Sequence, residues 1–333
     1  HDFRKNAFFY DQWGYERYKV YTNNLGFKDF KNRKINFKEK NILFIGDSFT
    51  EGVGLKFEDT YVGKISNQIS SDKILVLNAG VQSYSPKVYY AKLYDIIYRK
   101  RYPITHVVLM ISGGDVYDDY YKYKEVDERN ILLHDDFQNK YIINIINFIK
   151  ANTFSYQLIT RITPPKVIPE LISSIFKKEE ISKDYNSQED KFKKISAKQI
   201  MKFDFLNRDD YKYLYEEEEF LNWGKDAIIN SSIYIEKVGQ ILKNENIRYD
   251  VLYAQDAPLV LIKPINKNLK FLLNNFEKAT NKYDGNFYHI KDFTLTYSNS
   301  IEAYKDLFYI MDHHYNKKGN LKVAEEILLK IKF

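Results

Sequence analysis

The 333-residue sequence contains no cysteine, and it has only 13 glycines and 7 prolines. Without cysteine the chain has no disulfide bonds, no thiolate metal site and no cysteine nucleophile. Its longest apolar runs, at 42–45 and 107–111, have the length of a strand and fall far short of the ~20 residues that a membrane-spanning helix needs. Any nucleophile in this chain is therefore expected to be an oxygen.

Positive charge is concentrated at the N-terminus. The net charge is +6, and residues 1–40 hold ten Lys and Arg against five Asp and Glu, which places +5 in this segment. No nucleic-acid-binding motif accompanies these charges, so we interpret the segment as a solvated surface and expect no nucleic-acid partner. The chain opens on His1, so we expect a trimmed form whose removed N-terminal segment brought it close to a membrane.

Short apolar runs, typical of buried strands, alternate along the chain with segments whose apolar residues recur at helical spacing. The first three runs each end in Gly, Asn, Asp or Ser, and a final helix is expected at 320–331. The expected strands are 41–45, 74–77, 106–111, 249–253 and 287–290. This order predicts an α/β fold with three α/β/α layers around a flavodoxin-like parallel sheet. Functional groups gather at the carboxyl ends of such strands.

Residues 116–245 break the alternation, because a parallel crossover needs only about a dozen residues. We predict a mostly helical insertion between the third and fourth strands, lying beside or over the strand ends. Its charge-dense run at 177–194 is interpreted as a solvated helix face. The expected domain is 41–333, this insertion included, with residues 1–40 as an N-terminal arm packed on it.

The first strand ends in Gly46-Asp47-Ser48, directly before a predicted helix. A serine there can act as a nucleophile, because nearby backbone N–H groups can hold a developing oxyanion. The alternative from this context alone is that Asp47 or Ser48 merely caps the helix.

A serine nucleophile needs a base, and the base needs an acid that orients it. Of the six histidines, His313 and His314 follow Asp312 just before the last helix. In an extended loop, residues two apart point to the same side, so Asp312 and His314 can face the site together while His313 points away. The alternative is an exposed polar loop without a role.

Together these segments resemble the SGNH (GDSL-type) hydrolase family, in particular a bacterial branch of it. The resemblance implies that Ser48 is the nucleophile, His314 the base and Asp312 its orienting acid. It implies that the backbone N–H groups of Ser48 and Gly80 hold the oxyanion. Asp47, Asn78 and Asp115 are expected to support the site, without cofactor or metal. The implied substrate is a small ester, such as an O-acetyl group on an extracytoplasmic glycan, and the implied location is periplasmic or membrane-anchored.

The third block departs from the family pattern. Its usual Gly-x-Asn-Asp reads Ser112-Gly113-Gly114-Asp115 here, so Gly114 stands where an asparagine side chain would complete the oxyanion hole. Gly114 can offer only its backbone N–H, and losing one such donor costs about 10²- to 10³-fold in turnover. Asn78 and Gln82 are the candidates to fill the gap. The nearby Asp118 and Asp119 are expected to be structural rather than metal ligands.

Two other functions remain open from the sequence. The same residues could transfer an acyl group to a polysaccharide or cell-wall sugar. Because of Gly114, the domain could instead be catalytically weak or inactive and bind a glycan or a partner. A flavodoxin-like cofactor binder is disfavoured, since no glycine-rich phosphate loop is present.

Overall fold

The structure, a computed structural model, describes residues 2–13, 16–35, 39–71, 73–124, 196–202, 206, 208–261, 266–309 and 311–333. The charge run predicted at 177–194 lies outside these residues. No helix in the described part is long and apolar enough to cross a membrane.

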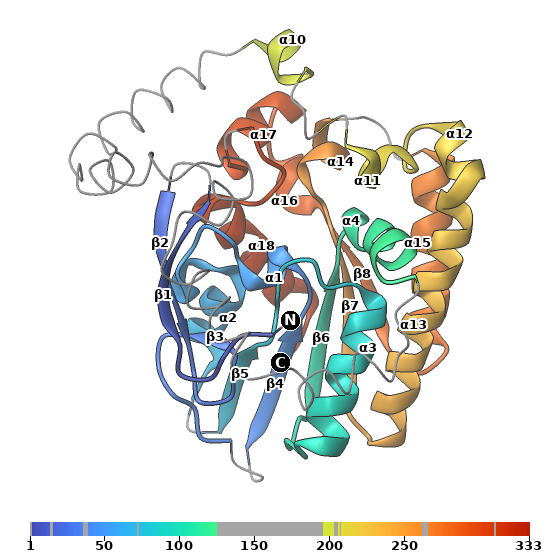
Figure 1. Ribbon diagram of the computed structural model, residues 1–333. Helices are drawn as coiled ribbons and strands as arrows, with labels where there is room; N and C mark the ends of the chain where they lie inside the picture. The colour runs from blue at the N-terminus through green and yellow to red at the C-terminus, as the bar shows by residue number, and fades with distance from the viewer. Residues whose placement is uncertain are drawn as a thin grey trace, which may run out of the picture.

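One eight-stranded sheet forms the centre of the molecule, in the order β1-β2-β3-β5-β4-β6-β7-β8 (Figure 1). The last five strands in this order run parallel. They are β4 (Lys40–Ile45), β5 (Ile74–Asn78), β6 (His106–Ile111), β7 (Arg248–Ala254) and β8 (Asn286–Ile290). Strands β4 and β6 are buried almost throughout, as central parallel strands covered on both faces must be. The predicted parallel sheet is confirmed.

Helices cover both faces of the sheet. On one face α3 (Pro86–Tyr94) and α15 (Lys267–Asn281) flank α13 (Lys225–Asn244), and on the other α2 (Tyr61–Ile69) packs against α18 (Lys317–Lys330). Side chains alternate between the two cores along β4: Leu43 and Ile45 join one, Ile42 and Phe44 the other. The α/β/α layering predicted from the sequence is therefore confirmed.

The N-terminal segment is part of the sheet. Strands β1 (Phe8–Trp13) and β2 (Glu16–Thr22) form an antiparallel hairpin, and β3 (Lys28–Asp29) joins β2 to β5 in antiparallel pairing. The sequence analysis assigned no strand here, because aromatic side chains stand at exposed as well as buried positions of the hairpin; Phe8 and Tyr10 are exposed. The arm thus extends the sheet edge next to β5.

A buried lysine joins this N-terminal segment to the turn that carries Ser48. The Lys28 side chain is fully buried, and its Nζ donates to the carbonyl of Gly52 at 2.9 Å, just past α1 (Ser48–Glu51). Burial lowers the pKa of Lys28 to about 8, although Glu51 and Asp11 favour its charged form. The arm therefore contacts the helix of the candidate nucleophile directly.

The described part of the predicted insertion is helical, in agreement with the sequence. Apart from α13, its elements are η3 (Asp118–Lys122), α10 (Ala197–Ile200), α11 (Asp209–Lys212), α12 (Glu217–Glu219) and η6 (Phe220–Gly224). The insertion begins within the short helix α4 (Gly113–Tyr117), which follows β6. The remaining short helices are η1 (Phe57–Asp59), η2 (Asp95–Arg99), α14 (Ala257–Leu261), α16 (Asp292–Leu295) and α17 (Ser300–Leu307). Segment 208–215 of this insertion contacts both α4, at the strand ends, and the start of α15.

Candidate active site

Ser48 is the first residue of α1, at the carboxyl end of β4. The side chain of Asp47 caps this helix by accepting a hydrogen bond from the Phe49 N–H at 2.9 Å. A side chain at Gly46 would lie 2.2 Å from Thr50 Oγ1 and 2.8 Å from the Met110 carbonyl, so only glycine permits this tight turn. The capping alternative thus applies to Asp47, which leaves the Ser48 hydroxyl available.

Ser48, His314 and Asp312 form a continuous hydrogen-bonded row. Ser48 Oγ lies 2.7 Å from His314 Nε2, and His314 Nδ1 lies 2.6 Å from Asp312 Oδ1. The same carboxylate oxygen accepts the backbone N–H of His314 at 2.8 Å. Because the carboxylate can only accept, Nδ1 carries the proton and Nε2 is left to accept from the serine hydroxyl. The structure therefore brings together the three residues that the sequence analysis selected.

The electrostatics of Asp312 suit an orienting acid. Burial alone would raise its pKa, but the neighbouring His314 and its hydrogen bonds outweigh burial and hold the pKa of Asp312 well below its usual range. Asp312 is therefore ionised at neutral pH and favours a positive charge on His314 when that ring accepts a proton.

Aromatic rings hold His314 in place. Phe49 packs against it with ring centroids 4.9 Å apart, and Trp13 of the N-terminal hairpin meets it edge-on at 4.8 Å and 87°. The sequence analysis missed Trp13, because nothing in residues 1–40 indicated a hairpin that reaches the strand ends.

His313 and His289 occupy other environments. His313 is buried against His314, with ring centroids 4.0 Å apart, and its Nδ1 lies 4.0 Å from Asp312 Oδ1. Burial holds the pKa of His313 well below its usual value, so the ring is neutral. His289 Nε2 lies 2.8 Å from Gln255 Oε1. Among the described histidines, His314 is the one whose ring nitrogen contacts Ser48 Oγ.

Two buried carboxyl groups lie behind the nucleophile, joined by one hydroxyl. Ser112 Oγ is 2.9 Å from Asp47 Oδ2 and 3.1 Å from Asp115 Oδ1, yet a hydroxyl has a single proton to donate. Burial, followed by the nearby Asp47, raises the pKa of Asp115 well above its ordinary value. A protonated Asp115 that donates to Ser112, which in turn donates to an ionised Asp47, satisfies all three groups. Both aspartates thus support the turn before Ser48.

The backbone N–H of Gly80 already has a partner. It donates to Asn78 Oδ1 at 3.0 Å, and Asn78 Nδ2 donates to the Thr50 carbonyl at 2.8 Å. A side chain at Gly80 would lie 2.4 Å from the Glu51 backbone nitrogen. The predicted oxyanion role of Gly80 is therefore not available in this conformation, because Gly80 and Asn78 fasten the loop after β5 onto α1. Gln82 is the other candidate donor, and its backbone N–H donates to Glu51 Oε2 at 2.7 Å.

Ser83, in the same loop, has a left-handed backbone with φ of 63°, which is costly for any residue but glycine. Its carbonyl accepts from the Tyr123 hydroxyl at 2.8 Å, while its N–H has no hydrogen-bond partner among the described residues. Residues with a strained backbone often lie at functional sites. A serine gives no signal of a positive φ in the sequence, so the sequence analysis did not single it out.

Gly114 lies in the first turn of α4, next to the insertion. A Cβ there would meet nothing closer than Tyr211 Oη at 3.6 Å, Ser112 Oγ at 3.7 Å and Asp210 Oδ2 at 3.9 Å, which are ordinary contacts. Gly114 is therefore required neither by space nor by its backbone, and the groups nearest to its missing side chain come largely from the insertion.

The acidic groups also determine where a cation could bind. Among the described residues, ligand atoms of Asp312, His313 and His314 lie within 4.8 Å of one another. A metal bound by them would compete with Ser48 and Asp312 for the two ring nitrogens of His314.

Asp119 accepts from Ser231 Oγ at 2.8 Å, and burial raises the pKa of both Asp118 and Asp119 to about 6. The predicted structural role of Asp119 agrees with this contact.

No protein-family model matches the chain, and no curated protein matches it. Solved structures that it resembles include Axe2, an acetylxylan esterase from Geobacillus stearothermophilus, with a TM-score of 0.45 and 12% identity over 90% of this chain and 97% of that one. Another is the acetyl xylan esterase AlAXEase, with a TM-score of 0.44 and 14% identity over 88% of this chain and 100% of that one. A third is the psychrotrophic esterase EstA from Pseudoalteromonas sp., with a TM-score of 0.43 and 12% identity over 87% of this chain and 95% of that one.

Proposed function

We propose that this protein is a serine-dependent esterase of the SGNH type that acts on a small acyl ester, with Ser48, His314 and Asp312 as its catalytic residues. The observation that carries the proposal is the unbroken row of hydrogen bonds, 2.7 Å from Ser48 Oγ to His314 Nε2 and 2.6 Å from His314 Nδ1 to Asp312 Oδ1. Nucleophile, base and orienting acid within hydrogen-bond reach are what acyl transfer by serine requires.

The steps follow from this arrangement. Ser48 Oγ attacks the ester carbonyl while His314 Nε2 takes its proton, and the resulting imidazolium is stabilised by the ionised Asp312. Collapse of the tetrahedral intermediate releases the alcohol, which receives the proton from His314 and leaves the acyl group on Ser48. Water then attacks this acyl-serine with His314 as base, and the carboxylic acid departs.

The oxyanion would be held by backbone donors. Within the described chain the Ser48 N–H has no hydrogen-bond partner, and it lies at the start of α1 beside the nucleophile. Gly80 is engaged with Asn78, and Gly114 has no side chain to contribute. We therefore propose that the oxyanion hole has fewer donors than in SGNH hydrolases, and that turnover is correspondingly slow.

The proposed substrate is an acetyl or similarly small ester on a glycan, met outside the cytoplasm. The support is the sequence resemblance to SGNH hydrolases in the blocks around Ser48 and His314. The rings of Trp13, Phe49 and His313 pack against His314, so aromatic rings surround the base on several sides.

A fluorophosphonate probe and p-nitrophenyl acetate test the proposal together. We expect the wild type to be labelled and to hydrolyse the ester, and Ser48→Ala to lose both, with at least a 10³-fold fall in kcat. EDTA should leave the rate unchanged, since no step needs a metal. Labelling of Ser48→Ala equal to the wild type, or no labelling of either, would contradict the proposal. Equal thermal melting of the two proteins is the folding control.

A further inference from the structure

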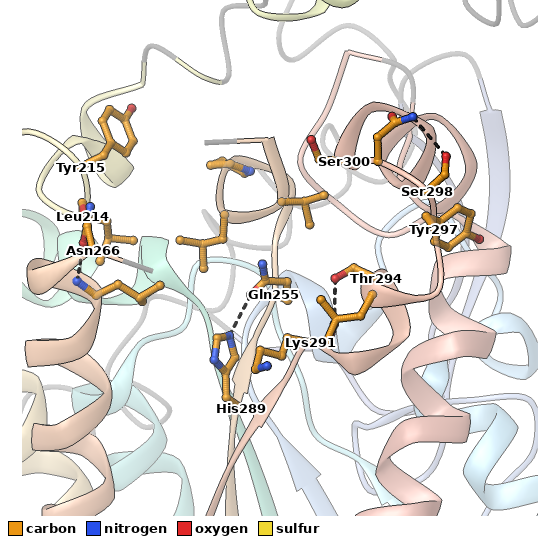
Figure 2. A pocket seen from close by; sticks show the side chains of 16 residues that line it. Leu214, Tyr215, Gln255, Asn266, His289, Lys291, Thr294, Tyr297, Ser298 and Ser300 are labelled. Atoms are coloured by element: carbon orange, nitrogen blue, oxygen red, sulfur yellow. Dashed lines mark hydrogen bonds between the residues drawn. The ribbon is translucent and has the colours of Figure 1, made fainter. Parts of the chain in front are cut away.

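A cavity of about 310 Å³ opens at the carboxyl ends of β7 and β8, and none of the three triad residues lines it. Figure 2 shows Leu214 and Tyr215 of the insertion on one side, Thr294, Tyr297 and Ser298 on the other, and His289 with Gln255 between them. Its volume is at the lower end of the range of small-molecule sites. Nothing in the proposed chemistry uses it.

The cavity is connected to the triad through Gln255. The backbone carbonyl of Gln255 accepts from the Tyr315 hydroxyl at 2.8 Å, and Tyr315 directly follows His314. Segment 208–215 of the insertion connects the two sites as well: Tyr211 packs against His313, while Leu214 and Tyr215 line the cavity. A ligand in the cavity would therefore bind next to the loop that holds the proposed base.

The floor of the cavity offers one hydrogen-bond donor and one acceptor. The contact between His289 Nε2 and Gln255 Oε1, at 2.8 Å, uses one ring nitrogen and one amide atom. In either orientation of the amide, the remaining amide atom and His289 Nδ1 form one donor and one acceptor, and neither has a partner among the described residues. A hydroxyl group, which both donates and accepts, matches such a pair.

The walls differ in character. Pro258, Leu259 and Val260 of α14, with Leu214 and Leu269, form an apolar wall. Across the cavity stand the hydroxyl and amide groups of 294–300. Sugar rings have this double character, with an apolar face of C–H groups and an edge of hydroxyls.

The charges in the lining favour a neutral ligand. Burial lowers the pKa of His289 to about 4, so the ring is uncharged at neutral pH. Lys291 lies 3.6 Å from Asp292, and Lys330 contacts both Asp292, at 2.7 Å, and Glu326, at 3.4 Å, so two carboxylates face the two lysines. The charge of Lys291 is thus balanced within the protein, and an anionic ligand would find no uncompensated cation there.

From this geometry we infer that the cavity is a subsite for a neutral sugar unit of the glycan that carries the ester. This inference rests on the proposed function for its biological meaning, but binding to the cavity does not depend on catalysis. The sugar would be held by Gln255 and His289 at the floor and would lie with its C–H face on the α14 wall.

Binding is tested first in Ser48→Ala protein. Saturation-transfer NMR and calorimetry measure the binding of four sugars: xylotetraose, cellotetraose, mannotetraose and chitotetraose. At least one member should bind, and adding Gln255→Leu should weaken it about tenfold, since one hydrogen bond is lost while the backbone carbonyl to Tyr315 remains. Lys291→Met is the matched control and should change the affinity little. Failure of every member to bind, or a larger loss with Lys291→Met than with Gln255→Leu, overturns the inference.

Catalysis supplies the second arm. Gln255→Leu in the otherwise wild-type chain should lower kcat/KM about tenfold on an acetylated tetrasaccharide and leave p-nitrophenyl acetate unchanged. Leu259→Trp, which narrows the cavity from the α14 wall, should likewise lower kcat/KM on the acetylated tetrasaccharide and leave p-nitrophenyl acetate unchanged. Equal losses on both esters would mean that the cavity supports the fold rather than the substrate. If the wild type hydrolyses neither ester, the proposed function fails, while the binding arm still decides about the cavity.

Discussion

The two sides of Ser48 are built to different degrees. On the base side, His314 is fixed by a hydrogen bond from Ser48, by one that it donates to Asp312, and by aromatic rings from β1 and α1. On the donor side, the Gly80 N–H is engaged with Asn78, and Gly114 provides no side chain. In the proposed mechanism the groups that transfer the proton are therefore all in place, whereas fewer groups are left to stabilise negative charge.

This difference separates two requirements of ester chemistry that are usually met together. A base and its orienting acid create the nucleophile, and backbone or side-chain donors stabilise the intermediate that it forms. If the base side is intact, Ser48 should still react with a strongly activated ester or a phosphonate. If the donor side is reduced, turnover of an ordinary ester should be slow. The predictions below test each side separately.

The largest effect is expected on the base side. His314→Ala should lower kcat/KM for p-nitrophenyl acetate by at least about 10³-fold, and Asp312→Asn on the order of 10⁴-fold, because an asparagine can hold the wrong tautomer of the ring. Steady-state kinetics of the purified variants measures both.

His313 provides the matched control. It is the buried neighbour of His314 and has the same chemistry, but its Nδ1 is 4.0 Å from Asp312. His313→Gln should keep activity within about tenfold of the wild type. A loss as large as that of His314→Ala would show that the base had been assigned to the wrong ring.

The donor side should respond in the opposite direction. Gly114→Asn would supply the side-chain amide that SGNH hydrolases have there, and its Cβ would make only ordinary van der Waals contacts. Since one oxyanion donor is worth about 10²- to 10³-fold in turnover, we expect kcat to rise by tenfold or more on an ordinary acetyl ester.

Gly114→Ala is the control for the backbone at this position, because it adds a Cβ without a donor, and it should leave kcat close to that of the wild type. A rise in both variants would point to a backbone effect. No rise in Gly114→Asn would mean that the oxyanion is already fully held, with the unpaired N–H groups of Ser48 and Ser83 as the first candidates.

The five parallel strands and the residues of the base side could be predicted from the sequence, but the N-terminal strands β1, β2 and β3 and the contacts of the donor side could not, for physical reasons. Buried strands such as β4 and β6 are continuous apolar runs, and Asp312 and His314 follow a local spacing rule, so both can be read from neighbouring residues. The partner of the Gly80 N–H depends on how the loop after β5 folds back on itself, which a motif does not specify. Trp13 reaches His314 only because a hairpin extends the sheet edge, a contact across about 300 residues of sequence.

A smaller effect is expected from the carboxyl pair that lies behind both sides of the site. In the unfolded chain Asp115 ionises near its ordinary pKa of about 3.9. In the folded protein burial and Asp47 raise the pKa of Asp115 well above that. Below the unfolded pKa both states hold the proton and the fold bears no penalty. As the pH rises above it, the unfolded state alone loses the proton at first, so the fold loses stability until its own pKa is passed.

Asp115→Asn should remove this loss, because a neutral amide can keep accepting from the Tyr89 hydroxyl and can donate to Ser112 at every pH. The free energy of unfolding is measured with urea at pH 4 and at pH 7. Between these two pH values Asp115→Asn should gain stability relative to the wild type. Each pH unit over which only the folded protein keeps the proton contributes on the order of 1.4 kcal/mol to this difference. Asp115→Ala removes the 2.7 Å acceptor of the buried Tyr89 hydroxyl, which keeps only its 3.4 Å contact with the Tyr84 carbonyl, and it should be destabilised by about 1–3 kcal/mol at both pH values. Parallel pH dependence in wild type and Asp115→Asn would mean that both carboxylates are ionised behind Ser48, which would leave the turn of the nucleophile strained by their repulsion.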